Sequence, residues 1–192
     1  MVAQGIKILH IVAGVWKSSA GLATLVLGFS REQAVAGHQV QLVFLEGDRH
    51  DGVRRAEEAG VQVSTFERSF PRFLFFSWGL LFHLGKMIKQ VDVVHVHSNW
   101  TFPVWWGGYL AWRNKKTLVM SPQGCFDPLR LHHSAWKKRL VGWMDRWLLR
   151  RADVIHVTCE AEAVWVREFL EPQNPQKCTK KIVVIPNGVG LV

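Results

Sequence analysis

The sequence predicts an α/β protein built on an open, doubly wound and mostly parallel seven-stranded sheet. Short β-branched, apolar runs alternate along the chain with segments whose apolar residues recur at helical spacing, a pattern typical of repeated strand–helix–strand units. Several runs are continuously apolar, as expected where helices cover both faces of a parallel sheet. The predicted strands are Ile6–Val12, Val40–Phe44, Val61–Phe66, Val91–His97, Thr117–Met120, Val154–Thr158 and Ile182–Ile185.

Length and composition favour a single domain over residues 1–185. The chain has 192 residues, of which 48% are hydrophobic, enough for one sizeable core. Its net charge of +9 indicates an anionic partner such as a phosphate or a lipid headgroup. No recognised nucleic-acid motif accompanies this charge, so we expect no nucleic-acid partner. Three widely spaced cysteines without a CxxC pair fit the reducing cytoplasm, where we expect the protein to reside.

The first helix is predicted from an apolar stripe, and it ends at Gly37. The loop that opens it, Gly14–Gly21, offers backbone N–H groups at a helix N-terminus, which makes it either an anion site or an ordinary strand-to-helix turn. It matches neither the dinucleotide GxGxxG pattern nor the P-loop, which argues against a dehydrogenase and a P-loop nucleotidase. The stripe consists of Leu22, Leu25, Val26 and Phe29.

The most hydrophobic segment, Phe73–Leu84, is too short to cross a bilayer, which takes about 20 residues as a helix. We expect a crossover helix packed on the sheet. The alternative is a helix lying on a lipid surface, because basic residues flank the segment on both sides. These residues are Arg68, Arg72, Lys86 and Lys89.

The segment Ser134–Arg151 predicts a long helix with one apolar and one basic face. We expect its tryptophans to lie in the core, and the basic helix from Lys137 to Arg151 is a second candidate for contact with an anionic membrane. The apolar face comprises Trp136, Leu140, Trp143, Trp147 and Leu148, and the basic stripe comprises Arg139, Arg146 and Arg150.

Ligands of open α/β sheets bind beyond the carboxyl ends of the strands. The fourth strand ends in DVVHVHSNW, which places His95 and His97 on one side of the strand and Ser98, Asn99 and Trp100 at its mouth. Without an acidic or cysteine partner nearby, the histidines are expected to be buried and hydrogen-bonded, with no metal, and His97 is a candidate to face a substrate. Histidine, amide and indole groups together suit a sugar.

Two later strand ends add candidates. The loop Ser121–Pro128 has a path fixed by prolines and glycine, and it carries Gln123, which can donate and accept hydrogen bonds. After the sixth strand, Glu160 and Glu162 open a helix, where they either cap it or contact a ligand.

Seven segments, in this order and spacing, carry a resemblance that covers essentially the whole chain: KILHIV, AGHQVQLV, DVVHVHSNW, SPQGCFDP, WKKRL, RRADVIHVTCEAE and IPNGV. Together they resemble the N-terminal, Rossmann-like domain of the GT4 glycosyltransferases, which have the GT-B fold. The similarity is greatest to the bacterial branch that builds lipopolysaccharide and exopolysaccharide.

The resemblance implies a retaining transfer of a sugar from a nucleotide-sugar donor to a glycan or lipid-linked acceptor, without metal or another cofactor. It implies that Ala20 and Gly21 approach the donor phosphates and that Asn187 and Gly188 form the interdomain hinge. Gln123 stands at the candidate catalytic position, where many members carry a histidine. The acceptor and sugar cleft would be lined by His97, Ser98, Asn99, Trp100, Gln123, Gly124 and Glu160.

On this reading residues 186–192 begin the hinge, and the C-terminal donor domain is expected to be absent, so that the chain alone should be inactive. The alternatives are the separately encoded half of a split transferase and a non-catalytic scaffold module. The implied enzyme acts in the cytoplasm, with the cytoplasmic face of the inner membrane as a further place of contact.

Overall fold

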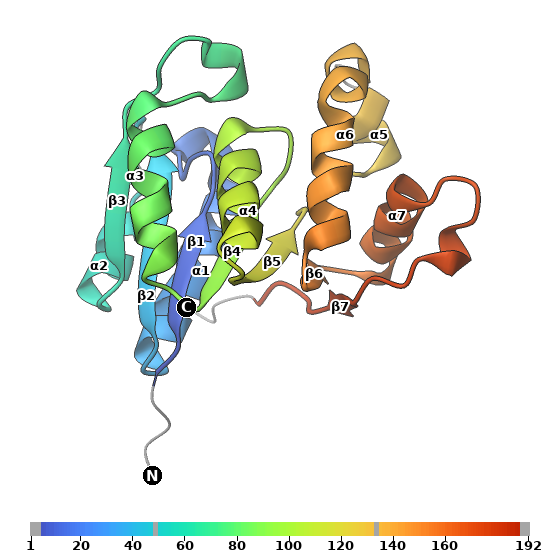
Figure 1. The fold of residues 1–192 in the computed structure, drawn as a ribbon. Helices are drawn as coiled ribbons and strands as arrows, with labels where there is room; N and C mark the ends of the chain where they lie inside the picture. Colours follow the sequence, from blue (N-terminus) through green and yellow to red (C-terminus); the bar gives the residue numbers. More distant parts are fainter. Residues whose placement is uncertain (1–4, 48–49, 133–134, 189–192) are drawn as a thin grey trace.

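The structure is a computed structural model that describes residues 5–47, 50–132 and 135–188, without the side chains of residues 19, 20 and 131–140 (Figure 1). Its seven strands form one sheet in the order β3-β2-β1-β4-β5-β6-β7, and every pairing is parallel. All seven predicted strands are therefore confirmed, and the mostly parallel sheet is entirely parallel. The strands are β1 (Lys7–Ile11), β2 (Gln39–Leu45), β3 (Gln62–Phe66), β4 (Val93–His97), β5 (Thr117–Ser121), β6 (Val154–Val157) and β7 (Ile182–Val184).

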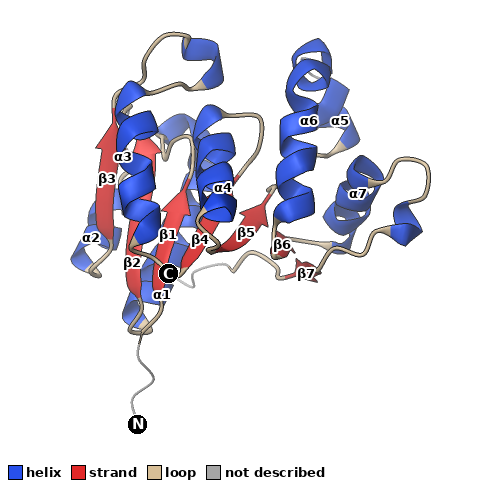
Figure 2. Ribbon diagram, in the orientation of Figure 1, coloured by secondary structure: helices blue, strands red, loops and turns tan. Residues whose placement is uncertain are grey.

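Helices cover both faces of the sheet, as the continuously apolar strands predict (Figure 2). One core lies between the sheet and α3, α4, α6 and α7, and a second, smaller core lies against α1 and α2. The α-helices are α1 (Ala20–Val35), α2 (Gly52–Glu58), α3 (Trp78–Lys89), α4 (Phe102–Arg113), α5 (Pro128–His132), α6 (Ala135–Arg151) and α7 (Glu160–Leu170). Short 3-10 helices lie at Lys17–Ser19, Arg72–Leu74 and Pro175–Lys177.

Helix α1 buries a different stripe from the predicted one. Leu22, Leu25 and Phe29 are only half-buried, and only Val26 of the predicted set is fully buried. The buried residues of the helix are Ala23, Val26, Leu27 and Ser30, of which the first three belong to the smaller core. The helix ends as predicted, before Gly37, which has a φ of 91°.

The hydrophobic segment Phe73–Leu84 is α-helical only from Trp78 onward, and its first two residues belong to the 3-10 helix Arg72–Leu74. Helix α3 begins after Ser77, whose side chain accepts a hydrogen bond from the Leu80 backbone N–H at 3.2 Å. Leu80 and Leu84 are fully buried, which confirms a helix packed on the sheet, whereas Phe82 on the opposite face is 68% exposed. No helix in the described ranges is long and apolar enough to cross a membrane.

Helix α6 departs most from its prediction. Leu148 is buried as expected, but Trp143 is 65% exposed and Trp147 is half-buried, so the core assignment of the tryptophans is wrong for Trp143. The arginines point to a neighbouring helix, since Arg146 donates to the Phe169 carbonyl at 2.9 Å and Arg150 to the Leu170 carbonyl at 3.0 Å. The predicted positions Trp136, Arg139 and Leu140 lie outside the described side chains.

Candidate functional site

The loops that follow β4, β5 and β6 meet at the carboxyl edge of the sheet. The Ser98 backbone N–H donates to the Ser121 carbonyl at 2.8 Å, and the Ser98 hydroxyl lies 3.4 Å from Cys125 Sγ. The predicted residues His97 to Trp100 therefore lie beside the loop that carries Gln123 and Gly124. Burial raises the pKa of the Cys125 thiol, so this sulfur is protonated at neutral pH.

A buried carboxylate on α6 holds the loop after β4. Asp145 Oδ1 accepts hydrogen bonds from Asn99 Nδ2 at 2.7 Å and from the Trp100 backbone N–H at 3.3 Å, and Oδ2 accepts from Trp105 Nε1 at 2.9 Å. Ser98 and Trp100 have φ angles of 71° and 64°, a left-handed conformation that costs free energy in residues with a side chain. Asp145 supplies the contacts that keep this path.

Burial raises the pKa of Asp145 to about 6, although the hydrogen bonds from Asn99, Trp105 and Trp100 act in the opposite direction. Those donors therefore favour the ionised form of the carboxylate and keep its pKa from rising further. This group is a structural centre of the site and carries a titration close to neutrality.

A second buried carboxylate, Glu162, holds the loop after β5. Its Oε1 accepts from the Gly124 backbone N–H at 2.5 Å, and its Oε2 accepts from the Thr158 backbone N–H at 2.8 Å and the Thr158 hydroxyl at 2.9 Å. Gln123 and Gly124 have φ angles of 55° and 72°. Glu162 therefore joins two strand-end loops, while the predicted cleft residue Glu160 is exposed at the first position of α7.

Several buried polar atoms in these two loops and at the end of β4 lack a hydrogen-bond partner. Within the part of the chain that the structure describes, they include His97 Nδ1, Asn99 Oδ1, Thr101 Oγ1 and Gln123 Nε2. Each such atom costs roughly 1–3 kcal/mol, so their gathering at this edge of the sheet calls for a functional explanation. A ligand rich in hydroxyl groups could satisfy both the donors and the acceptors once it displaces the side chains that cover them.

A network of buried histidines lies beneath this edge, on the face of the sheet that α1 covers. The strand register pairs His10 with His95 and His97 with Ser121. His10 Nε2 lies 2.7 Å from Gln33 Oε1, and His10 Nδ1 lies 2.9 Å from His97 Nε2. If Nε2 of His10 donates to Gln33, then His97 must donate from Nε2, which leaves His97 Nδ1 as the unpaired acceptor.

A second branch of the network reaches the segment after β7. His95 Nε2 lies 2.7 Å from the Ser121 hydroxyl, which lies 2.8 Å from His156 Nδ1, and His156 Nε2 donates to the Ile185 carbonyl at 3.1 Å. Neutral rings satisfy every one of these bonds. Burial lowers the pKa of His10 to about 4 and the pKa values of His95 and His97 well below 6.5.

His10, His95 and His97 also form the group of metal-capable side chains found in the described ranges. Their arrangement fits a hydrogen-bonded network better than a metal centre. His10 Nδ1 and His97 Nε2 are 2.9 Å apart, whereas two nitrogens on a tetrahedral zinc ion would lie about 3.3 Å apart. The His10 and His97 rings are stacked with an interplanar angle of 25°, so their lone pairs do not converge.

The loop after β1 is organised by Trp16. Its indole Nε1 donates to the Leu45 carbonyl at 3.3 Å, and its ring stacks on Phe75. A Cβ at Gly14 would lie 2.1 Å from the Trp16 ring, and one at Gly47 would lie 2.2 Å from it. Gly21, in contrast, is exposed with nothing within 4 Å of a Cβ. The side chain of Ala20 lies outside the description.

Gly14→Ala is expected to destabilise the protein by roughly 1–3 kcal/mol, because the rigid indole must move away from its contacts. Gly28→Ala in α1 is the matched control: a Cβ there meets nothing within 4 Å, and we expect a gain of about 0.5–1 kcal/mol from helix propensity. Urea unfolding measures both. Equal stabilities of the two variants would contradict the placement of Trp16.

Asn187 and Gly188, the predicted hinge residues, follow β7 and are exposed. Sequence reasoning did not single out Asp145 or His10, and it left Glu162 as either a helix cap or a ligand contact. Two signals were available in the printed sequence: Asp145 is the acidic residue in an otherwise apolar and basic helix, and His10 interrupts the apolar run KILHIV. A single acidic residue in such a helix indicates a buried carboxylate with hydrogen-bond donors around it. A histidine within an apolar strand indicates a polar contact across the sheet.

Three comparisons relate this chain to known proteins. A protein-family model described as Glycosyltransferase Family 4 matches residues 19–191. No curated protein sequence matches the chain. Among solved structures, the chain is similar to HepE of Anabaena in complex with UDP and glucose, with 14% identity and a TM-score of 0.63 over 96% of this chain and 45% of that chain.

Two further solved structures share the fold. Sucrose-phosphate synthase from Thermosynechococcus elongatus has 13% identity and a TM-score of 0.61 over 94% of this chain and 48% of that chain. MurG of Acinetobacter baumannii has 14% identity and a TM-score of 0.56 over 93% of this chain and 45% of that chain. The chain thus spans less than half the length of each of these proteins.

Proposed function

The chain belongs to glycosyltransferase family 4, and on this premise we propose that it is the acceptor-binding, N-terminal domain of a retaining glycosyltransferase. In this proposal the complete enzyme transfers a sugar from a nucleotide-sugar donor to a glycan or lipid-linked acceptor during cell-surface polysaccharide biosynthesis. The unpaired polar atoms of His97, Asn99, Thr101 and Gln123 are the observation that carries the acceptor role. Sugars offer hydroxyl groups that donate to and accept from such atoms, and the site's strained backbone is held in advance by Asp145 and Glu162.

The donor side would lie at the N-terminus of α1. There Gly21 leaves open space for a phosphate to approach the backbone, and the helix dipole favours an anion. HepE was solved with UDP and with UDP-glucose, which supports a nucleotide-sugar donor for this chain. We propose that residues 1–185 form the acceptor-side domain, that Asn187 and Gly188 begin the hinge, and that the nucleotide is held by a second domain of a larger or two-chain enzyme.

The proposed transfer uses no metal, since the histidine network fits neutral, hydrogen-bonded rings. We also propose contact with an anionic membrane surface on the cytoplasmic side. Exposed Phe73, Trp78 and Phe82 lie in the segment flanked by basic residues, an arrangement suited to the interface between lipid headgroups and acyl chains. Flotation with anionic vesicles at low salt is the direct check, and a chain that stays unbound would refute this contact.

Gln123→Gly tests the acceptor role. Glycine adopts a positive φ without strain, so this change removes the amide without disturbing the loop. We expect binding of the chain to an immobilised panel of bacterial surface glycans and lipid-linked oligosaccharides to fall at least about tenfold, because the amide would pair with a sugar hydroxyl in a desolvated site. The thermal midpoint should stay within a few degrees of the parent.

Lys115→Gly is the matched control, since Lys115 also has a φ of 55° but lies exposed in the turn between α4 and β5. This variant should bind glycans like the parent. Two results would refute the acceptor role: the parent protein binds no glycan of the panel, or Gln123→Gly binds glycans as well as the parent does.

A further inference from the structure

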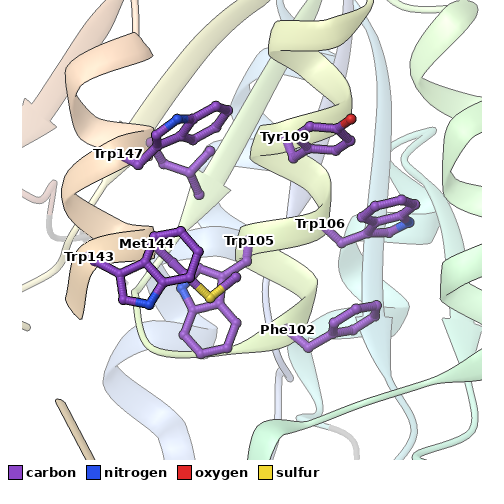
Figure 3. A pocket seen from close by; sticks show the side chains of 8 residues that line it. Phe102, Trp105, Trp106, Tyr109, Trp143, Met144 and Trp147 are labelled. Carbon is purple, nitrogen blue, oxygen red and sulfur yellow. The ribbon is translucent and has the colours of Figure 1, made fainter. Parts of the chain in front are cut away.

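An apolar groove runs between α4 and α6, next to the loop that follows β4 (Figure 3). Its volume is about 370 Å³, within the range of small-molecule sites. Aromatic rings from both helices face the groove, and Met144 and Leu148 complete its lining. The aromatic residues are Phe102, Trp105, Trp106, Tyr109, Trp143 and Trp147.

The groove is apolar because two of its indoles turn their N–H groups away from it. Trp105 Nε1 donates to Asp145, and Trp106 Nε1 donates to the Leu81 carbonyl at 3.1 Å. Their ring carbons are left to form the wall. A polar ligand would find few hydrogen-bonding groups in this lining, whereas a hydrocarbon would lose no hydrogen bond on entering.

The groove continues into a belt of aromatic rings that reaches α3. The ring centroids of Trp147 and Tyr109 are 6.2 Å apart. The Tyr109 ring stacks on that of Trp106 with 5.5 Å between their centroids, and the Trp106 ring stacks on that of Phe102 with 6.3 Å between them. Phe76, 4.7 Å from Phe102, links these rings to Trp78. Trp143 and Trp78 are 65% and 57% exposed, so the belt opens to the outside of the molecule. Such rings are typical of the boundary between lipid headgroups and acyl chains.

Positive charge lies at one end of the groove. The guanidinium of Arg151 lies 3.9 Å from the centroid of the Trp147 ring and 5.1 Å from that of Trp112. Stacking occupies the flat face of a guanidinium and leaves its N–H edge directed outward. Arg151 is exposed, and no carboxylate among the described residues pairs with it. An anionic group at this end would gain a bidentate partner.

We propose that the groove between α4 and α6 binds one hydrocarbon chain of an anionic membrane phospholipid, whose phosphate pairs with Arg151. The apolar lining favours the hydrocarbon chain of the lipid, and the arginine favours a negatively charged headgroup. The occupant is therefore amphiphilic, unlike the hydroxyl-rich ligand of the carboxyl-edge loops.

Isothermal titration calorimetry of the chain with dodecyl phosphate, kept below its critical micelle concentration, tests the proposal. We expect one molecule bound per chain, no binding of inorganic phosphate, and weaker binding of dodecyl maltoside, which has a neutral headgroup. Trp143→Glu places a carboxylate at the groove wall and should weaken binding at least about tenfold. Arg151→Gln should weaken it about fivefold, the effect of one cation near a lipid phosphate.

Val35→Glu is the matched control, because Val35 is 70% exposed on α1, on the other face of the sheet. It should bind dodecyl phosphate like the parent. As a second measurement, phosphatidylglycerol vesicles with brominated acyl chains should quench the tryptophan fluorescence of the parent more than that of Trp143→Glu.

Four outcomes would overturn the proposal: no binding of dodecyl phosphate, equal binding by Trp143→Glu and the parent, equal affinity for dodecyl maltoside, or equal quenching of the two proteins. A dimer seen by light scattering that Trp143→Glu dissociates would also overturn it, because the groove would then be an interface between two copies of the chain.

Discussion

Asp145→Ala is expected to destabilise the protein by roughly 3–5 kcal/mol and to release the loop formed by residues 98–101. The change strands the Asn99 amide, the Trp100 backbone N–H and the Trp105 indole, all of which donate to this carboxylate. Removing the buried charge offsets part of the loss, because the raised pKa of about 6 shows that ionisation is unfavourable there. The loss of hydrogen bonds to the three donors is nevertheless the larger effect, so the net change in the free energy of unfolding is destabilising.

Urea unfolding at pH 7 measures this loss of stability, and two further variants serve for comparison. Asp153→Ala removes an exposed carboxylate that accepts one backbone N–H, from Leu118 at 2.8 Å, and should cost about 1 kcal/mol. Asp145→Asn keeps an oxygen for Asn99 and Trp100 but turns an amide N–H toward Trp105, so it should cost less than alanine. A loss for Asp145→Ala no larger than that for Asp153→Ala would contradict the central role of Asp145.

Loss of Asp145 should also weaken glycan binding. Ser98 and Trp100 keep their left-handed φ angles only while neighbouring contacts hold them, and Asp145 provides these contacts. The glycan panel used for Gln123→Gly therefore gives a second measurement. Asp145→Ala, assayed at a temperature at which it is still folded, should lose binding, whereas Asp145→Asn, which keeps an oxygen for Asn99 and Trp100, should lose less. Asp145 acts here as a positioning residue, since its hydrogen bonds reach the loop and not the ligand.

The second large effect is acid destabilisation by the histidine network. His10 has a pKa of about 4 in the folded protein because burial disfavours its charged form, whereas an unfolded histidine has a pKa near 6.5. Between these values the unfolded chain binds a proton that the folded chain does not. Stability therefore falls as the pH drops below 6.5, by about 3 kcal/mol from His10 alone once pH 4 is reached.

His95 and His97 act in the same direction, since their pKa values are also lowered by burial, and then by repulsion from neighbouring histidines. Asp145 acts in the opposite direction. Its pKa is raised from 3.8 to about 6, so the folded protein takes up a proton between pH 6 and pH 4 before the unfolded chain does. One of the three histidine contributions is thereby offset, and the net effect of acid remains destabilising.

Urea unfolding at a series of pH values between 7.5 and 4 checks the network, because the slope of the free energy of unfolding against pH counts the protons taken up on unfolding. His10→Gln should lower that slope by about one proton below pH 6.5. Asp145→Asn removes the opposing group and should make the acid loss steeper below pH 6. A free energy of unfolding that does not change between pH 6.5 and pH 4 would contradict the buried neutral histidines.

The seven strands were predictable because a strand buried on both faces leaves a continuous apolar run in the sequence. The ends of helices were harder to predict. The whole segment Phe73–Leu84 is apolar, so its hydrophobicity did not show that the helix begins after Ser77, where a single side-chain hydrogen bond caps it. In α6, tryptophan was assigned to the core by its hydrophobicity, yet Trp143 lies at the mouth of a groove. Residue type alone does not distinguish a core from an exposed apolar site.

The sequence by itself determined the parallel sheet, the strand ends at which His97 to Trp100 and Gln123 stand, and membership of the family, because all three depend on the local order of residues along the chain. Only the tertiary structure brought Asp145 to Asn99, Glu162 to Gly124 and His10 to His97. These pairs are 38 to 87 residues apart. A buried polar group acquires its partners only when distant elements pack, and periodicity along one element carries no information about the neighbour that it will meet.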